Sequence, residues 1–370
     1  GKYAVIRGVG DSYTSTQINS VRLPSADPEK RAVQLDLFPN ALVDTLQVSK
    51  TFSPDQQGDS GGGAINIITR AIPREPVYSF KISQGHRDGI TENKNFLSNN
   101  RTITDYWGRQ PNRALSMRST EIPVIDRGSD LDGVVSDKEQ EADSLIKGLT
   151  TVVGPTCKAP PADHSWSATV GDFLDFTNSD WRVGGLFSIS YSRKYSGYYN
   201  AIKQSVTDPA DTTEPLQVQS ASRETMGAEK ILWGRIATLG LSLHDEQEIG
   251  VTHIATHAAD NYTSQRIFDI PVEDKPWGPN NALCQNTLDY SERSMDSLQT
   301  FGRHKLPFLG DWKLFGVIDM DYPIFDWTGA HSESKLYQPD LTRSSGIRTN
   351  DASGVRWSDP TCGRDWYQIE

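Results

Sequence analysis

The chain of 370 residues has no long hydrophobic run, only 3 cysteines and no cluster of basic residues. Because no stretch approaches the ~18 consecutive apolar residues of a spanning helix, the sequence excludes a membrane protein built from such helices. The net charge of −11 argues against a nucleic-acid-binding protein, since neutralising phosphates needs a basic face. In contrast, 9 Trp, 13 Tyr and 12 Phe are too much aromatic mass for a disordered chain.

Residues 1–74 are dense in turn residues and predict a compact α/β unit. The run Gly61-Gly62-Gly63 leads into an apolar strand, because glycine takes positive φ at little steric cost. Residues 35–38, which precede Pro39, predict one helical turn. The strands expected in this unit cover residues 3–6, 14–21, 43–48 and 64–69.

Beyond Pro76 the sequence changes to segments with period-two alternation, in which one face is apolar and the other is small or polar. The clearest segments are 77–85, 181–193, 238–243 and 249–256. In a soluble sandwich the apolar face points inward, whereas in an outer-membrane barrel it points outward to lipid. The alternation alone leaves both architectures open.

The lengths of the connections favour the barrel. Residues 173–181 and 243–249 are short connections, whereas 86–164, 194–229 and 261–290 are long and polar. Structureless loops of this length are uncommon in compact soluble domains. Short turns that alternate with long loops are typical of a barrel with one end in the periplasm and the other outside the cell.

The first 76 residues resemble the plug domain of TonB-dependent outer-membrane receptors. The order and spacing of several segments carry the resemblance, and none does so alone. Weaker similarity continues at Asp105-Tyr106-Trp107-Gly108 and at Asp326-Trp327-Thr328-Gly329. The segments that resemble the plug are 3–8, 13–16, 19–25, 35–39, 48–55 and 61–70.

The resemblance implies a mainly β protein, a transmembrane antiparallel β-barrel with an N-terminal α/β plug in its lumen. The full barrel of this family has ~22 strands, and about seven are expected in this chain. Residues 1–74 would be the C-terminal part of the plug, and 75–370 the first strands and long extracellular loops of an incomplete barrel. The chain begins Gly1-Lys2-Tyr3, without the family's TonB box, so we expect it to be an interior piece of a longer protein.

The function that the resemblance implies is uptake across the outer membrane of a Gram-negative cell. The solute would be large and scarce, of the siderophore, cobalamin, glycan or peptide class, and a TonB-type protein would supply energy from the inner membrane. Outer-membrane lipid, lipopolysaccharide and a surface protein are the other expected partners, and no enzyme activity, metal or cofactor is expected. The alternative is a surface scaffold or signalling receptor of the same fold that does not transport.

Site residues are expected from the resemblance in three places. Arg7 would latch the plug to the barrel wall. The plug apex, where a solute would bind, would include Asp11, Ser12, Tyr13, Arg22 and Ser25. Cys157, Cys284 and Cys362 are expected in exterior loops, and Cys284 with Cys362 is the disulfide to test, because disulfides are allowed outside the cytoplasm.

Two motifs that suggest other chemistry are rejected. Gly-Asp-Ser-Gly-Gly around Ser60 resembles a serine-protease nucleophile, but no histidine precedes it in the chain. A soluble hydrolase that uses Ser60 therefore ranks third among the readings. His253 and His257 have the spacing of a helical metal pair, but the alternation around them predicts a strand, where they lie ~13 Å apart. Trp166, Trp181 and Tyr191 are expected at strand ends, as in an aromatic girdle.

Overall fold

The computed structural model contains strands, turns, bends and irregular segments, and no helix, in the part of the chain that it describes. No helix in that part is long and apolar enough to span a membrane. The described residues are 6, 14–25, 33, 38, 43–50, 63–69, 75–99, 106–109, 154–176, 180–207, 217–244, 246–268, 281–306, 312–314, 318–320, 323–351, 354–358 and 365–369.

Four strands near the N-terminus form a small sheet in the order β2-β1-β4-β3. Strands β1 and β4 are parallel, and the other two pairs are antiparallel. The expected strands at 43–48 and 64–69 are confirmed. Apart from Phe38 and Ile6, the helical turn predicted at 35–38 and the strand predicted at 3–6 lie outside the described residues. The strands are β1 (Thr14–Ile18), β2 (Val21–Arg22), β3 (Val43–Ser49) and β4 (Gly63–Thr69).

The expected single strand at 14–21 is a hairpin instead. Its turn is Asn19-Ser20, and both residues have positive φ, 49° and 68°. Two-residue hairpin turns of this kind match the twist of the flanking strands. The Ser20 backbone N–H donates to Asn66 Oδ1 at 2.9 Å, and Asn66 Nδ2 donates to Ser20 Oγ. These hydrogen bonds hold a tight turn without glycine.

A second, large sheet contains nine strands, all in antiparallel pairs. Along the sheet the order is β16-β15-β12-β11-β10-β9-β8-β5, with β17 also paired to β15. In the described part, β5 and β16 are its two ends and do not pair, so the sheet is open. The strands are β5 (Val77–Gly85), β8 (Asp163–Asp175), β9 (Trp181–Thr207), β10 (Gln217–Leu243), β11 (Gln247–Phe268), β12 (Asn281–Lys305), β15 (Ile324–Asp351), β16 (Gly354–Ser358) and β17 (Asp365–Ile369).

Two of the predicted long loops are mostly strand. Residues 194–207 and 217–229 extend β9 and β10, and most of 261–290 belongs to β11 and β12. Backbone pairing continues there although the apolar alternation has ended, because ladder hydrogen bonds do not depend on side-chain polarity. A bulge at Asn200, with φ of 50°, lets β9 continue past an irregularity.

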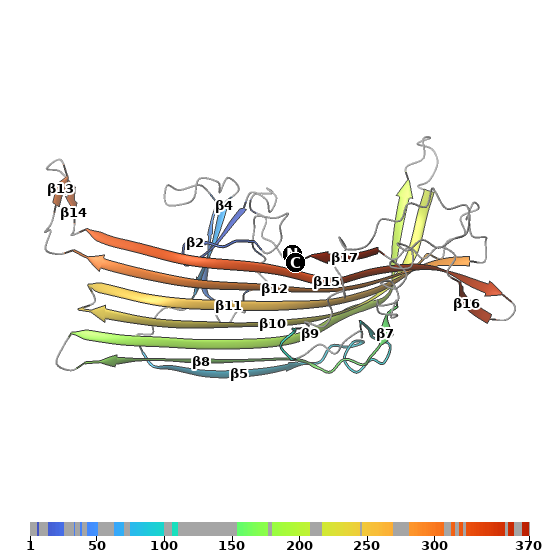
Figure 1. The fold of residues 1–370 in the computed structure, drawn as a ribbon, viewed down its shortest axis with the longest axis horizontal. Coiled ribbons are helices and arrows are strands. Elements are labelled where there is room, and N and C mark those ends of the chain that lie inside the picture. The colour runs from blue at the N-terminus through green and yellow to red at the C-terminus, as the bar shows by residue number, and fades with distance from the viewer. Residues whose placement is uncertain are drawn as a thin grey trace, which may run out of the picture.

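Two short hairpin-like pairs lie outside the main sheets. Strands β6 (Leu97–Ser98) and β7 (Thr156–Cys157) belong to the long connection between β5 and β8. Strands β13 (Trp312–Leu314) and β14 (Ile318–Met320) connect β12 to β15. Figure 1 shows the long strands side by side, with the small sheet near their middle.

Candidate functional site

The small sheet packs against one face of the large sheet, which we call the docked face. Ile18, Leu23 and Ile67 of the small-sheet region share one buried apolar cluster with side chains of β9 to β12. Those partners alternate in register along the strands, so they belong to a single face. They are Leu186, Ile236, Ile254, Ala258 and Met295.

The tip of the β1–β2 hairpin joins the docked face through two side-chain amides. Asn19 Nδ2 donates to Gln299 Oε1 at 3.0 Å, and Gln299 Nε2 donates to the Ile18 carbonyl at 3.3 Å. Asn19 Oδ1 also accepts from the Thr69 backbone N–H at 3.0 Å, which ties the tip to β4. Gln299 is 1% exposed. We call Asn19 and Gln299 the amide contact; it links the two sheets without charge.

Further along the docked face a buried carboxylate lies among cations. Glu224, only 2% exposed, forms ion pairs with Lys203 and with Arg266, the latter at 3.5 Å, and accepts a hydrogen bond from Tyr198 Oη at 3.0 Å. Glu224 is twelve positions along β10 from Ile236, or ~40 Å at ~3.3 Å per residue. Between these levels Asp260 pairs with Arg293.

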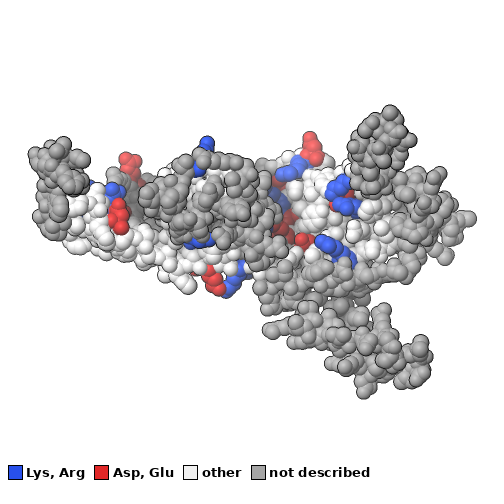
Figure 2. All heavy atoms as spheres, turned by 90° about the horizontal axis from the view of Figure 1, so that it is seen from above, with Lys and Arg blue, Asp and Glu red and all other residues white. Residues whose placement is uncertain are grey.

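The environment of Glu224 stabilises its ionised form. Burial alone would raise its pKa, but hydrogen bonds from Lys203 and Tyr198 and the charge of Arg266 outweigh burial, so the pKa is lowered. Burial and the neighbouring Glu224 raise the pKa of Tyr198 to about 12, so its hydroxyl keeps its proton at neutral pH. Figure 2 shows acidic and basic side chains intermingled on the face that it displays.

The opposite face of the large sheet is exposed and apolar over part of its height. Phe80, Ile82, Val170 and Leu239 are between 51% and 77% exposed. Phe187 belongs to the same face, because it pairs directly with Val170. These exposed apolar side chains lie on neighbouring strands and form a patch, in which Asp172 and Arg235 of the same face are also exposed.

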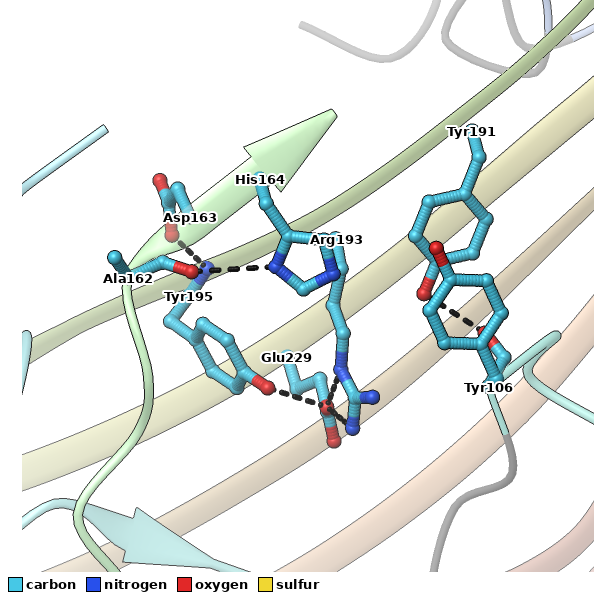
Figure 3. A network of polar contacts seen from close by, with 8 residues as sticks. All are labelled: Tyr106, Ala162, Asp163, His164, Tyr191, Arg193, Tyr195 and Glu229. Atoms are coloured by element: carbon cyan, nitrogen blue, oxygen red, sulfur yellow. Dashed lines mark hydrogen bonds and ion pairs between the residues drawn. The ribbon is translucent and has the colours of Figure 1, made fainter. Parts of the chain in front are cut away.

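Aromatic residues bound this patch along β9. Trp181 lies at one end of the patch and at the start of β9, as the sequence predicts. Tyr191, paired with Trp166, lies at the other end of the patch, but it is inside the strand and not near its end, because β9 continues to Thr207. Beyond Tyr191 the face becomes ionic, where Glu229 accepts from Arg193 Nε at 2.6 Å and from Tyr195 Oη at 3.0 Å (Figure 3). The order along the strand is therefore apolar, aromatic and ionic.

Two of the predicted apex and latch residues, Arg22 and Ser25, are among the described residues. Arg7, Asp11, Ser12 and Tyr13 lie outside the described residues, as does Ser60. Arg22 is on β2, opposite Gln17, and Ser25 lies three residues after the end of that strand. Both residues are half-buried. Their predicted contact with a solute stays a prediction.

Cys284 lies in strand β12 and not in an exterior loop, so that expectation is wrong. The strand extends to Asn281 because its backbone pairs with both β11 and β15. Cys284 is 1% exposed, and its Sγ lies 3.8 Å from Asn286 Oδ1. Cys157 is exposed on β7. Cys362 lies outside the described residues, so the Cys284–Cys362 pairing stays a prediction.

The two histidines four positions apart have separate partners. His253 Nε2 lies 3.0 Å from Asp296 Oδ2, and His257 Nε2 lies 3.0 Å from the Gly108 carbonyl oxygen. Both are on strand β11, as the alternation predicts. Within the described residues no three metal-ligating side chains gather at one place.

The sequence did not single out Gln299 or Glu224. Glu224 falls in the predicted long connection 194–229, and Gln299 lies outside the segments whose alternation predicts a face. Their partners lie on other strands or in the small sheet, so the local sequence does not indicate them. Only the sheet register brings Glu224 beside Arg266, its direct neighbour on β11.

Comparison with known proteins finds distant likeness among solved structures. No protein-family model and no curated protein sequence matches the chain. The structure of the outer membrane transporter YddB from Escherichia coli is similar at 10% identity and a TM-score of 0.27, over 96% of this chain and 51% of that chain. The chain thus spans about half the length of that transporter.

Proposed function

We propose that this chain is part of an outer-membrane barrel of the TonB-dependent type, with the small sheet as the remaining part of its plug. The observation that carries the proposal is the contrast between the two faces of the large sheet. One face presents exposed apolar side chains such as Phe80 and Ile82, and the other docks the small sheet. This is the arrangement of a barrel wall with lipid outside and a plugged lumen inside.

The height of the apolar patch supports a membrane. Trp181 and Tyr191 are ten positions apart on β9, which corresponds to ~33 Å of strand. At a strand tilt of ~40° this length spans ~25 Å, the height of the apolar band between the aromatic girdles of outer-membrane barrels. The ends of the patch therefore coincide with the two expected interfaces.

The docked face suits a polar solute that passes the small sheet. The part of this face beyond the small sheet contains Tyr198, Glu224 with its cations, and the Asp260–Arg293 pair. It therefore offers a hydroxyl group and charges of both signs. Siderophores, cobalamin, glycans and peptides all contain groups that such a wall binds. The proposal includes a TonB-type partner that supplies energy, and it includes no catalytic step and no cofactor.

A non-transporting scaffold or signalling receptor is the second candidate. The observation that favours it is the apolar packing between Ile18, Leu23 or Ile67 and the docked face. Separating these side chains exposes apolar surface at ~25 cal/mol per Å². A plug held by such packing resists movement, so a small sheet that never leaves the wall fits this alternative.

The test uses the full-length protein in a Gram-negative host, with and without TonB. We expect the protein in the outer-membrane fraction, with a shift in gel mobility on heating, and uptake of its solute class only when TonB is present. If the protein is present in the outer-membrane fraction but none of the four solute classes is taken up in a TonB-dependent way, the result favours the scaffold. A protein that is soluble without detergent refutes both candidates.

A further inference from the structure

Part of the long connection between β5 and β8 docks on the face opposite the small sheet. Tyr191, Trp233 and His257 are direct neighbours across β9, β10 and β11, so they share one face. Phe187 is four positions before Tyr191 and lies on the same, exposed apolar face. Side chains of this row contact residues 106–109, which therefore lie on the outside of the proposed barrel.

Three consecutive backbone carbonyls of this segment are held by side chains of the wall. A peptide group placed on a sheet face loses water and needs such donors. The donors are Tyr191 Oη to Tyr106 O at 2.8 Å, Trp233 Nε1 to Trp107 O at 3.0 Å, and Tyr290 Oη and His257 Nε2 to Gly108 O at 2.9 and 3.0 Å.

Ring packing fixes the same segment. Tyr106 stacks on Tyr191 with centroids 4.3 Å apart, as Figure 3 shows, and Trp107 meets Tyr191 and Trp233 edge to face at 5.7 and 5.8 Å. Gly108 has φ of +72°, and a Cβ there would lie 2.7 Å from the Cβ of Ala259. The backbone touches the wall only because this residue is glycine.

A second stretch of the connection docks further along the same face. Phe96 packs edge to face on Tyr195 at 6.1 Å between centroids. A Cβ on Gly227 would lie 2.0 Å from the Leu97 carbonyl oxygen, so the strand must have glycine there. The connection therefore follows the exterior of the wall at two levels.

The outer surface of the docked segment is amphipathic. Tyr106 and Trp107 remain 44% and 39% exposed despite their contacts. Arg109 is exposed and places its guanidinium 5.6 Å from the centroid of the Trp233 ring. These side chains lie at the level where the apolar patch ends and the Arg193–Glu229 pair begins. Tyr and Trp favour this level of a membrane, since one end of each ring system is apolar and the other is polar.

We infer that residues 106–109 form a lipid-headgroup site on the barrel exterior. Tyr106 and Trp107 lie in the headgroup layer of the outer leaflet, and Arg109 binds the phosphate groups of its lipids. The inference rests on the proposed function, because it needs a lipid bilayer around the apolar patch. It assigns this part of the connection to anchoring the barrel in the membrane, and not to covering the solute path.

The test measures depth in a bilayer with spin labels on the full-length protein in vesicles, after Cys157, Cys284 and Cys362 are replaced. Labels are attached at Phe80→Cys, Arg109→Cys and Asp88→Cys, and their accessibility to oxygen and to a water-soluble nickel complex is compared. We expect the label at 80 in the hydrocarbon, the label at 109 at the headgroups, and the label at 88 in water.

The outcomes separate the two claims. If the label at 80 is in hydrocarbon but the label at 109 is as accessible to nickel as the label at 88, the headgroup site is refuted and the proposed function stands. If the label at 80 is itself in water, the proposed function fails. As a second measurement, we expect Arg109→Gln to reduce retention of anionic phospholipid in mass spectra at least twofold, and Arg87→Gln, whose partner is Asp163, to leave it unchanged.

Discussion

At the scale of single residues, the most constrained group on the docked face is the Glu224 carboxylate. It is buried yet ionised, because Lys203, Arg266 and Tyr198 all stabilise its negative charge. Loss of that charge leaves two cations facing each other and a tyrosine hydroxyl with a weaker acceptor. Buried hydrogen bonds to charged groups contribute ~1.5–3 kcal/mol each, although partial exposure of Lys203 and Arg266 reduces the share of the ion pairs.

We therefore expect Glu224→Gln to lower the free energy of unfolding by ~1–2 kcal/mol at pH 7. The folded-state pKa of Glu224 is lowered, so the stabilisation is complete above the ordinary glutamate pKa of ~4.3 and is lost as pH falls through the folded value. Thermal unfolding in detergent at pH 7, 5, 4 and 3 measures this. The thermal stabilities of the wild type and Glu224→Gln should converge at low pH. The control Glu246→Gln, at an exposed turn, should be as stable as the wild type at every pH. A stability difference between the wild type and Glu224→Gln that stays constant with pH contradicts the stabilising role of the ionised Glu224.

At the scale of elements, two glycines of the β5–β8 connection distinguish two effects of adding a side chain: the strain of a positive φ and a clash with neighbouring atoms. Gly108 and Gly89 have nearly equal φ, +72° and +76°, but only Gly108 lies against other atoms. A side chain at either position has the cost of a left-handed backbone, of ~1 kcal/mol. Only at Gly108 does the new Cβ also meet Ala259 and Ile231.

We expect Gly108→Ala to release residues 106–109 from the wall and Gly89→Ala to leave them docked. Limited proteolysis of the full-length protein in detergent measures the release, with cleavage at least several-fold faster in the connection of Gly108→Ala. Tryptophan fluorescence gives a second readout, since Trp107 loses its contacts with Tyr191 and Trp233. Equal protection of the two variants contradicts docking at this site.

The same elements show what the sequence can and cannot predict. Alternation at 77–85 and 181–193 predicts strands and their apolar face correctly, because lipid or core selects one face of each strand. It does not predict where β9 to β12 end, since the distal halves have polar side chains on both faces. It also does not predict docking of residues 106–109, because the donors that hold them come from four different strands, β9 to β12.

At the scale of the whole molecule, the two sheets are joined by apolar packing and by the amide contact, and the two differ in how they respond to movement. Apolar packing between Ile18 and the docked face is non-directional and weakens gradually. The Asn19–Gln299 contact is directional, and Gln299 is fully buried, so it is either made or lost. Movement of the small sheet, the proposed plug, away from the wall breaks this contact, and Gln299 is the residue to change.

We expect Gln299→Ala to loosen the small sheet while the barrel still folds. The change removes hydrogen bonds to Asn19 and to the Ile18 carbonyl, at a cost of ~1–3 kcal/mol in docking free energy. Cells with this variant should become several-fold more sensitive to large antibiotics that the outer membrane excludes, at unchanged protein level in that membrane. Gln265→Ala is the matched control, because Gln265 is on β11 and bonds to Asn286, away from the small sheet. Equal sensitivity of both variants would show that the amide contact does not hold the small sheet, the proposed plug, in place.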